Sequence, residues 1–261
     1  MPKIRAVFTD IDNTLTSPVT HQIPASAIWA IEQARQNGIK VFAATGRNLT
    51  AYGNGPVAAF DLDGYVTVNG QLCYLPDGQI LRMETFDPAV IEATLNLGSE
   101  HGFFTTFLEK DQVYLNGINT PVEEFYKIIN TGIPTVVPDH QISREAILSI
   151  VPFVYEEMDA LFEEALPNCQ VVRWNPYSCD LAPRIGGKDV GIRKMLEYFE
   201  ISMEETLAIG DGGNDVSMLK AVGVGVAVGN ARPEAIEAAD YLAPDVDDDA
   251  ILKTFQQFGL I

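Results

Sequence analysis

A short apolar segment near the amino end of the chain runs directly into two aspartates. Residues 6–9 (AVFT) have the composition of a buried β-strand, and Asp10 and Asp12 follow it. In an open parallel sheet, ligands bind at the carboxyl ends of the strands, so acids at this position are placed for chemistry. Because side chains alternate along a strand, the chain must turn between the two aspartates, and Asn13 and Thr14 are turn-forming residues. A lone pair of this kind is more typical of a solvated acidic turn, so three further segments decide its meaning.

Helices and strands alternate at both ends of the chain. Near the amino end we predict helices over 24–37 and 48–60, the second weakened by Gly53 and Gly55, and strands over 40–44 and 65–68. After residue 186 we predict helices over 188–199, 215–221 and 233–239 and strands over 207–210 and 225–228. Strands that alternate with helices indicate a parallel sheet, so both ends are expected to build one α/β core.

The middle of the chain has a different pattern. Asn69-Gly70, Asp77-Gly78 and residues 109–111 (EKD) fall between short alternating runs, which indicates hairpins and antiparallel strands. The other elements predicted here are helices over 87–101, 122–130 and 155–166 and strands over 147–151, 170–173 and 178–182. We therefore predict an α/β fold with a Rossmann-like parallel-sheet core, residues 1–81 and 184–261, and an inserted α+β domain, residues 82–183.

Charge and cysteine content limit the partners and the compartment. The chain has 17 basic and 36 acidic residues, and its net charge of −19 repels nucleic acid and anionic membranes. The three cysteines form no C-x-x-C pair, which argues against a disulfide framework or a zinc site. The first apolar segment is too short for a signal peptide, and no run approaches the length of a membrane span. We expect a cytoplasmic protein, whose oligomeric state the sequence does not specify.

Two more segments carry groups suited to binding an anion. Thr45, Gly46 and Arg47 follow a predicted strand and precede a helix, where a hydroxyl, an amide N–H and a helix amino terminus can hold phosphate. Lys188 follows two glycines at a predicted helix start, where a cation opposes the helix dipole and a bound anion would compensate for it. Each segment alone is also typical of an ordinary turn.

Residues 210–215 (GDGGND) form a glycine-rich loop that offers only oxygen ligands, which suits a hard cation such as Mg²⁺ better than zinc. If Asp10, Asp12 and Asp211 converge at about 4 Å, each pair repels by roughly 4 kcal/mol at an effective dielectric near 20. The total of about 12 kcal/mol is comparable with the stability of a whole domain. A divalent ion and Lys188 must then be part of the site, or the acids must take up protons. We therefore predict metal dependence.

In their order along the chain, these segments resemble the four motifs of the haloacid dehalogenase (HAD) superfamily of phosphotransferases. The matching positions are Asp10-x-Asp12-x-Thr14, Thr45, Lys188 and residues 210–215. Residues 225–231 (GVAVGNA) and 238–241 (AADY) are similar to the Cof-type, subclass IIB branch of sugar phosphatases. Asn13 stands where the family usually has glycine, and asparagine tolerates a left-handed backbone better than other non-glycine residues. With 34 residues between Asp10 and Thr45 and 142 between Thr45 and Lys188, the layout resembles members with a large α+β (C2-type) cap after the second motif.

The resemblance implies a role for each matched residue. Asp10 is implied to be the nucleophile that forms an aspartyl-phosphate, and Asp12 the general acid and base. Mg²⁺ is implied to be held by Asp10, Asp211 and the backbone carbonyl of Asp12, with Asp215 orienting bound water. The groups implied to bind phosphoryl oxygens are Thr45, the Gly46 amide, Lys188 and Asn214, with Arg47 as a weaker candidate.

The resemblance also implies a function: a Mg²⁺-dependent phosphatase for small phosphorylated metabolites, sugar phosphates above all, with specificity in the cap. A sugar phosphomutase is the enzymatic alternative, whereas the dehalogenases proper lack the second aspartate. Two alternatives are not enzymes. A phospho-aspartate switch needs a much shorter chain, and a sugar-phosphate sensor would not need all the charged groups that catalytic turnover requires. Trp174, Asn175 and Tyr177 are candidates for sugar contacts, although a core position is the simpler interpretation of Trp174.

Overall fold

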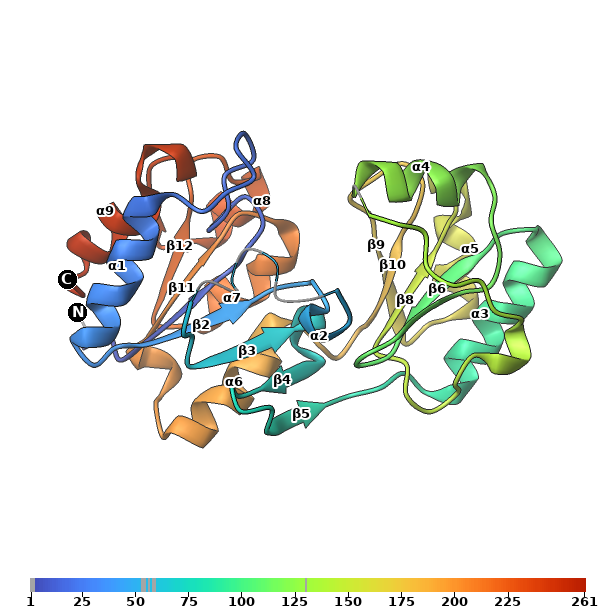
Figure 1. Cartoon of the computed structure of the whole chain (residues 1–261), viewed down its shortest axis with the longest axis horizontal. Helices are drawn as coiled ribbons and strands as arrows, with labels where there is room; N and C mark the ends of the chain where they lie inside the picture. Colours follow the sequence, from blue (N-terminus) through green and yellow to red (C-terminus); the bar gives the residue numbers. More distant parts are fainter. Residues whose placement is uncertain (1–2, 53–54, 56, 58–59, 130) are drawn as a thin grey trace. The chain divides into compact units, whose positions relative to one another are not determined.

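The computed structural model describes residues 3–52, 55, 57, 60–129 and 131–261. The chain divides into two compact units, each with its own sheet (Figure 1). The core unit comprises Met1–Met83 and Gly187–Ile261, and the inserted unit comprises Glu84–Gly186. The predicted α/β class with a parallel-sheet core is confirmed.

The core unit is built on an eight-stranded sheet in the order β13-β12-β11-β1-β2-β3-β4-β5. The six strands from β13 to β3 pair in parallel, and β4 and β5 extend the sheet antiparallel. Their bounds are β1 Ala6–Thr9, β2 Lys40–Ala44, β3 Gly64–Thr67, β4 Leu72–Tyr74, β5 Ile80–Met83, β11 Thr206–Gly210, β12 Val224–Ala227 and β13 Tyr241–Leu242.

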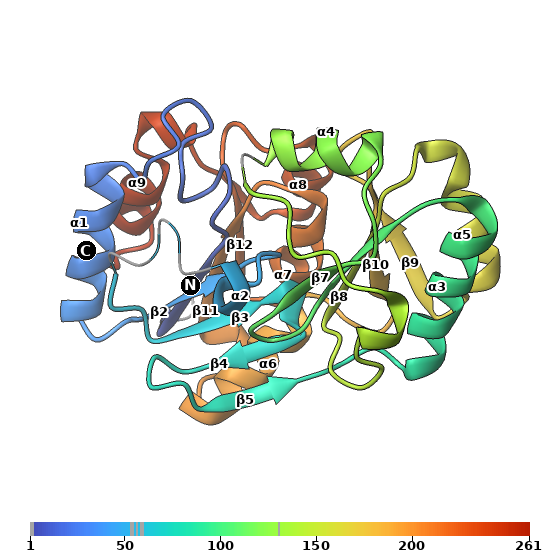
Figure 2. The same cartoon turned by 45° about the vertical axis from the view of Figure 1, so that its right-hand side comes forward.

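Helices cover both faces of this sheet (Figures 1 and 2). Val7 of β1 packs in the cluster that contains α1 and α9, whereas its neighbour Phe8 packs in the cluster that contains α6, α7 and α8. Burial on both faces explains why these strands read as continuous apolar runs. Among the described residues the helices are α1 Ala25–Gln36, α2 Leu49–Tyr52, α6 Lys188–Phe199, α7 Val216–Ala221, α8 Pro233–Ala238 and α9 Ala250–Gln257, with 3₁₀ turns at Val68–Gly70, Met203–Glu205, Gly213–Asp215 and Val246–Asp248.

The inserted unit has a five-stranded antiparallel sheet in the order β7-β6-β8-β10-β9 (Figures 1 and 2). Helices α3 and α5 pack on one face, around Phe107, and α4 packs on the other, around Phe153. Asn119 and Asp87 cap α4 and α3, each followed by a proline in the first turn. The bounds are α3 Pro88–His101, β6 Thr105–Leu108, β7 Val113–Leu115, α4 Thr120–Ile128, β8 Ser149–Pro152, α5 Asp159–Ala165, β9 Cys169–Val172 and β10 Asp180–Pro183, with 3₁₀ turns at Asp139–Gln141 and Glu156–Met158.

Several predicted elements have different bounds in the structure. Of the helix predicted over 48–60, the structure describes α2, whereas residues 53, 54, 56, 58 and 59 lie outside the described residues. The strand predicted over 65–68 ends one residue early, because Val68 turns into a left-handed conformation with φ of 50°. The helix predicted over 155–166 begins only at Asp159, after a 3₁₀ turn, and Asn130 at the end of the helix predicted over 122–130 lies outside the described residues.

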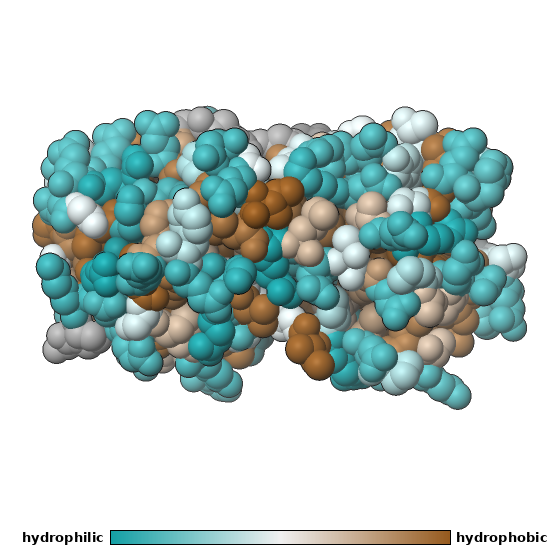
Figure 3. Space-filling model, turned by 90° about the horizontal axis from the view of Figure 1, so that it is seen from below, coloured by the Kyte–Doolittle hydropathy of each residue, from teal (hydrophilic) through white to brown (hydrophobic). Residues whose placement is uncertain are grey.

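The surface and the cysteines agree with the composition. Hydrophilic residues make up most of the face in Figure 3, with smaller hydrophobic patches between them. The three cysteines, Cys73, Cys169 and Cys179, are buried and free, as the lack of pairing in the sequence predicts. Across the described residues, no helix has the length and apolarity needed to cross a membrane.

Candidate active site

Polar side chains gather where β1, β2 and β11 end. The register pairs Thr9 of β1 with Ile209 of β11 and with Ala43 of β2, so the residues that follow these strands meet at one edge of the sheet. The N–H of Asp10 donates to the carbonyl of Ile209 at 2.9 Å, which continues the pairing by one residue. This register brings Asp10 and Asp211 together, although about two hundred positions separate them in the chain.

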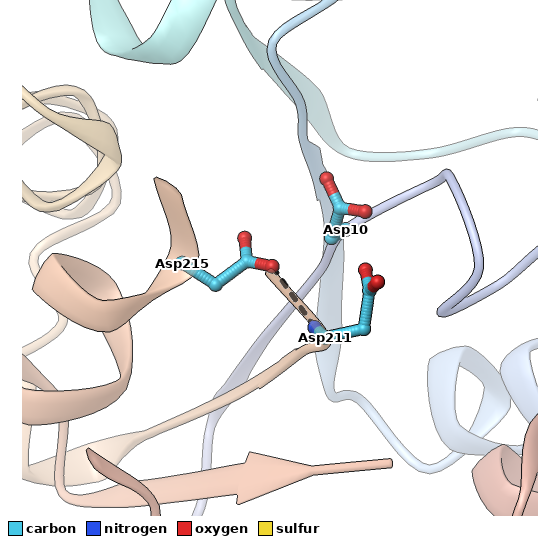
Figure 4. A group of neighbouring side chains, drawn as sticks. All are labelled: Asp10, Asp211 and Asp215. Carbon is cyan, nitrogen blue, oxygen red and sulfur yellow. Dashed lines mark hydrogen bonds between the residues drawn. The ribbon is translucent and has the colours of Figure 1, made fainter. Parts of the chain in front are cut away.

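Three carboxylates form the centre of the site. Oxygen atoms of Asp10, Asp211 and Asp215 lie within 4.8 Å of one another (Figure 4). The ammonium group of Lys188 donates to Oδ1 of Asp10 at 2.5 Å and to Oδ1 of Asp215 at 2.6 Å, and its side chain is fully buried. If all three acids are ionised, Lys188 neutralises one of their negative charges and two remain uncompensated.

The glycine-rich loop explains how Asp215 reaches this position. Its Oδ2 accepts hydrogen bonds from the backbone N–H groups of Asp211 and Gly212, both at 2.9 Å, and Figure 4 draws the first of them. A Cβ atom on Gly210 would lie only 2.5 Å from Cγ of Asp215, so a side chain at position 210 would displace the carboxylate. The three acids that converge are therefore Asp10, Asp211 and Asp215, all of which the sequence analysis named for the metal site. The carboxylate of Asp12, whose convergence with Asp10 and Asp211 the sequence analysis considered, is not part of this group.

Asp12 is held apart from the three acids by Arg47. The guanidinium donates to both carboxylate oxygens of Asp12, from Nε at 2.8 Å and from Nη2 at 2.5 Å. Both side chains are nearly half exposed, at 46% for Asp12 and 45% for Arg47. The hydrogen bond to Asp12 raises the pKa of the Arg47 guanidinium, so Arg47 stays charged. Arg47, expected as a weaker phosphate-binding candidate, thus has a carboxylate partner of its own.

The turn after β1 forms as the sequence predicts. Asn13 adopts φ of 57°, a left-handed conformation that glycine adopts most readily and that asparagine tolerates. Its carbonyl oxygen accepts from the side chain of Asn230 at 2.7 Å. The hydroxyl of Thr14 donates to Oδ1 of Asp211 at 3.0 Å and so links the first and last motifs.

Burial and mutual repulsion change the acidity of the cluster. Burial raises the pKa of Asp10 well above its usual range; Lys188 opposes this rise, and Asp215 and Asp211 add to it. Burial, followed by the charge of Asp215, raises the pKa of Asp211 to about 6. Burial alone would lower the pKa of Lys188, but the charges of Asp10 and Asp215 outweigh it and raise this pKa. Excess negative charge on an oxygen-only donor set is the environment that a divalent cation such as Mg²⁺ fits.

The expected phosphate-binding groups lie beside this cluster. Thr45 is buried, and its Oγ1 accepts from the N–H of Arg47 at 3.1 Å, which leaves the hydroxyl proton free to be donated. A Cβ atom on Gly46 would lie 3.6 Å from Nδ2 of Asn214, so the loops after β2 and β11 meet at Gly46. Nδ2 of Asn214 also donates to Oδ1 of Asn69 at 3.1 Å.

A model of one protein family matches residues 7–255: the haloacid dehalogenase-like hydrolases. The chain belongs to this family. A phosphatase of the haloalkanoate (HAD) superfamily from Bacteroides thetaiotaomicron has a TM-score of 0.92 and 30% identity, with 99% of this chain and 96% of that chain covered. A HAD subclass IIB sugar phosphatase has a TM-score of 0.89 and 32% identity, with 98% and 100% covered. YkrA of Bacillus subtilis is 29% identical, with 98% of both chains covered.

These similarities confirm the predicted superfamily, its Cof-type branch and the enzyme class of phosphatase. In this HAD phosphatase, two residues that lie beside the motifs have no functional signal in the sequence. Asn69 contacts Asn214, although Asn69-Gly70 is recognisable in the sequence only as a hairpin signal. Asn230 lies in the segment similar to the Cof-type branch, but its bond to Asn13 has no local signal.

The candidate sugar contacts in the inserted unit have different surroundings. Asn175 is buried, and its side chain bonds to Ser178 and to the N–H of Tyr177, so it stabilises its own turn. Trp174 is 44% exposed, which is incompatible with a core position. Its ring packs against Phe125 in a T-shaped arrangement, with the ring centroids 5.7 Å apart.

Proposed function

We propose that this chain is a Mg²⁺-dependent phosphatase that hydrolyses small phosphorylated metabolites, most of all sugar phosphates, through an aspartyl-phosphate intermediate. The observation that carries the proposal is the buried ion-pair cluster of Asp10, Asp215 and Lys188, with Asp211 within 4.8 Å. The similarity to a subclass IIB sugar phosphatase over nearly the whole chain supports the choice of substrate class.

In the first step Asp10 acts as the nucleophile. Its Oδ1 is engaged by Lys188, whereas its Oδ2 accepts no hydrogen bond from the described residues and is the atom assigned to the attack. A bond forms between Oδ2 and phosphorus, and the bond between phosphorus and the leaving oxygen breaks. To act as the general acid, Asp12 first takes up a proton and releases one of its two hydrogen bonds from Arg47, and it then gives that proton to the leaving alkoxide.

In the second step Asp12 takes a proton from water as the water oxygen attacks phosphorus. The bond between phosphorus and Asp10 then breaks, which releases inorganic phosphate and restores the free carboxylate. Thr45, the Gly46 amide, Lys188 and Asn214 bind the phosphoryl oxygens, where alignment and charge stabilisation provide most of the rate.

The metal site is assigned to Asp10, Asp211, Asp215 and the backbone carbonyl of Asp12. When bound there, Mg²⁺ neutralises charge on the carboxylates and on the transferring phosphoryl group. The inserted unit, Glu84–Gly186, is assigned the role of the cap that determines substrate specificity. The protein is assigned to the cytoplasm.

The proposal is tested by a screen of phosphorylated metabolites with the purified full-length chain and Mg²⁺. We expect release of inorganic phosphate from hexose or pentose phosphates, with kcat at least about 10⁶-fold the first-order rate constant of the uncatalysed buffer control, the lower end of typical enzymatic enhancements. An isomerised sugar phosphate without phosphate release would identify a mutase instead. A stable aspartyl-phosphate without turnover would identify a switch, and binding alone a sensor.

Removal of divalent metal is expected to abolish phosphate release. Three acids against one lysine leave the cluster of Asp10, Asp211 and Asp215 with uncompensated charge when EDTA is present. Excess Mg²⁺ should restore both the rate and the thermal midpoint of unfolding, because an ion that binds the folded state stabilises it. Ca²⁺ at equal concentration serves as the charge-matched control, and full activity in EDTA would contradict the assignment.

The affinity for Mg²⁺ is expected to fall as the pH falls through 6. Because the pKa of metal-free Asp211 is raised to about 6, its carboxylate is mostly ionised at pH 7.5 and mostly protonated at pH 5. The ion must then displace a proton, which weakens the apparent affinity about tenfold at pH 5. Titration calorimetry at the two pH values measures this change and the protons released. Equal affinities at both would show that Asp211 is not a ligand.

A further inference from the structure

The turn that follows β3 has a backbone conformation that non-glycine residues rarely adopt. Three consecutive residues have positive φ: 50° at Val68, 51° at Asn69 and 93° at Gly70. The Asn-Gly pair is compatible with such a turn, but a left-handed valine is a genuine outlier. A strained backbone of this kind persists only where the surrounding structure holds it, and such positions are concentrated at functional sites.

The turn is held by two neighbouring parts of the active site. The N–H groups of Val68 and Asn69 each donate to a carbonyl oxygen of the loop 45–47 (TGR), both at 3.1 Å. Gly70 packs against the residue that precedes α6, since a Cβ atom on Gly70 would come within 2.2 Å of the Gly187 carbonyl oxygen. The strained turn therefore joins the TGR loop to the start of the helix that carries the buried lysine.

The side chain of Asn69 extends from this turn toward the phosphate-binding groups. Its Oδ1 accepts a hydrogen bond from Nδ2 of Asn214 at 3.1 Å. A Cβ atom on Gly46 would lie 3.2 Å from Oδ1 of Asn69 and 3.6 Å from Nδ2 of Asn214, so the two amides lie side by side against Gly46. Because Asn69 accepts one of the two protons on Nδ2, it fixes which end of the Asn214 amide faces Gly46.

We propose that Asn69 is a positioning residue of the phosphate site. Its carbonyl oxygen fixes the amide of Asn214 so that the second N–H of Asn214 is directed at a phosphoryl oxygen. Asn69 lies outside the four motifs and acts through Asn214, and the strain at Val68 and Asn69 is retained because it places this amide. The inference rests on the proposed function for the identity of the ligand, a phosphoryl group.

Asn69→Gly tests this role without disturbing the turn. Glycine adopts φ near 51° readily, so the variant removes the amide and relieves strain at the same time. We expect kcat/KM toward p-nitrophenyl phosphate to fall about tenfold, mainly through kcat, while the thermal midpoint stays equal or rises. Glu200→Gly is the matched control: Glu200 has φ of 53° at the end of α6, and its replacement should leave kcat/KM unchanged.

A double-mutant cycle with Asn214→Ala separates positioning from a structural effect. If Asn69 acts through Asn214, then Asn69→Gly causes no further loss in the Asn214→Ala background. Three outcomes for Asn69→Gly would each overturn the inference. They are an equal loss of kcat/KM in the wild-type and Asn214→Ala backgrounds, a loss that follows a drop in thermal midpoint, and activity within twofold of wild type. Calorimetric titration with inorganic phosphate and Mg²⁺ repeats the cycle independently of turnover. A wild-type chain that binds phosphate without hydrolysis would refute the proposed function, and this cycle would still decide the role of Asn69.

Discussion

Asp10→Asn is expected to lower the rate of phosphate release by roughly four orders of magnitude or more, because an amide oxygen is a far weaker nucleophile than a carboxylate. The substitution keeps the shape of the side chain. Lys188 also keeps its bond to Asp215 at 2.6 Å, so the cluster does not lose its cation. A phosphate-release assay with saturating Mg²⁺ measures the effect. Activity within tenfold of wild type would remove Asp10 as the nucleophile.

The same variant should not be less stable than wild type without metal. With three acids and Lys188, the cluster has a formal charge of −2, and Asp10→Asn reduces it to −1. Less repulsion should leave the metal-free thermal midpoint equal or higher, which shows that lost activity is not lost folding. Asp77→Asn is the control. Asp77 lies in an exposed hairpin turn and accepts from the N–H of Gln79, a bond that the amide preserves, so its rate should match wild type.

Lys188→Met is expected to have the second largest effect, on both rate and stability. Lys188 is fully buried with carboxylates at 2.5 and 2.6 Å, and methionine fills a similar volume without charge. Removal of one member of a buried ion pair commonly destabilises a protein by about 3–5 kcal/mol, since the remaining charges lose their partner. The rate should fall by roughly three orders of magnitude, because the phosphoryl charge also loses its cation.

Urea unfolding with and without Mg²⁺ tests the stability effect of Lys188→Met. We expect added Mg²⁺ to restore part of the lost free energy of unfolding, because it brings positive charge back to the three acids. Lys194→Met on the same helix is the control. Lys194 is half exposed and pairs with Glu197 at 2.9 Å, and surface pairs contribute at most about 1 kcal/mol. Comparable effects of the two variants would mean that the buried cation has no special role.

The apolar pattern located the ends of the strands, and the family resemblance named Asp10, Asp211 and Asp215 for the metal site, but neither gave the direction of the Asp12 side chain. Asp10 and Asp211 are predictable because both directly follow apolar runs that pair in parallel. Asp12 and Asp215 are each a few residues further on, where backbone turns decide the direction of the side chain. Asp12 turns toward Arg47, 35 positions away, whereas backbone N–H groups in its own loop hold Asp215 in the cluster. The pairing of Asp12 with Arg47 has no signal in the neighbouring sequence, whereas the position of Asp215 is set by its own glycine-rich loop.

Regular elements were predictable where the apolar pattern is long or flanked by clear stops. The strand over 40–44 and the helix over 188–199 match the structure residue for residue. The two-residue strand Tyr241–Leu242 was missed because it exists only through pairing with β12. The left-handed valine at position 68 also had no signal, since its conformation is imposed by contacts with loop 45–47 and Gly187.

The position of β1 between β2 and β11 has a consequence for biosynthesis. While the ribosome adds the inserted unit, β1 has gained β2 as a neighbour but exposes its other edge, because β11 comes 200 positions after its partner, as in the pair Thr9 and Ile209. An open strand edge is a template for aggregation, and contacts this distant in sequence slow folding. We therefore expect the nascent chain to depend most on chaperones during this interval. Catalytic activity is expected only after Asp215 has left the ribosomal exit tunnel.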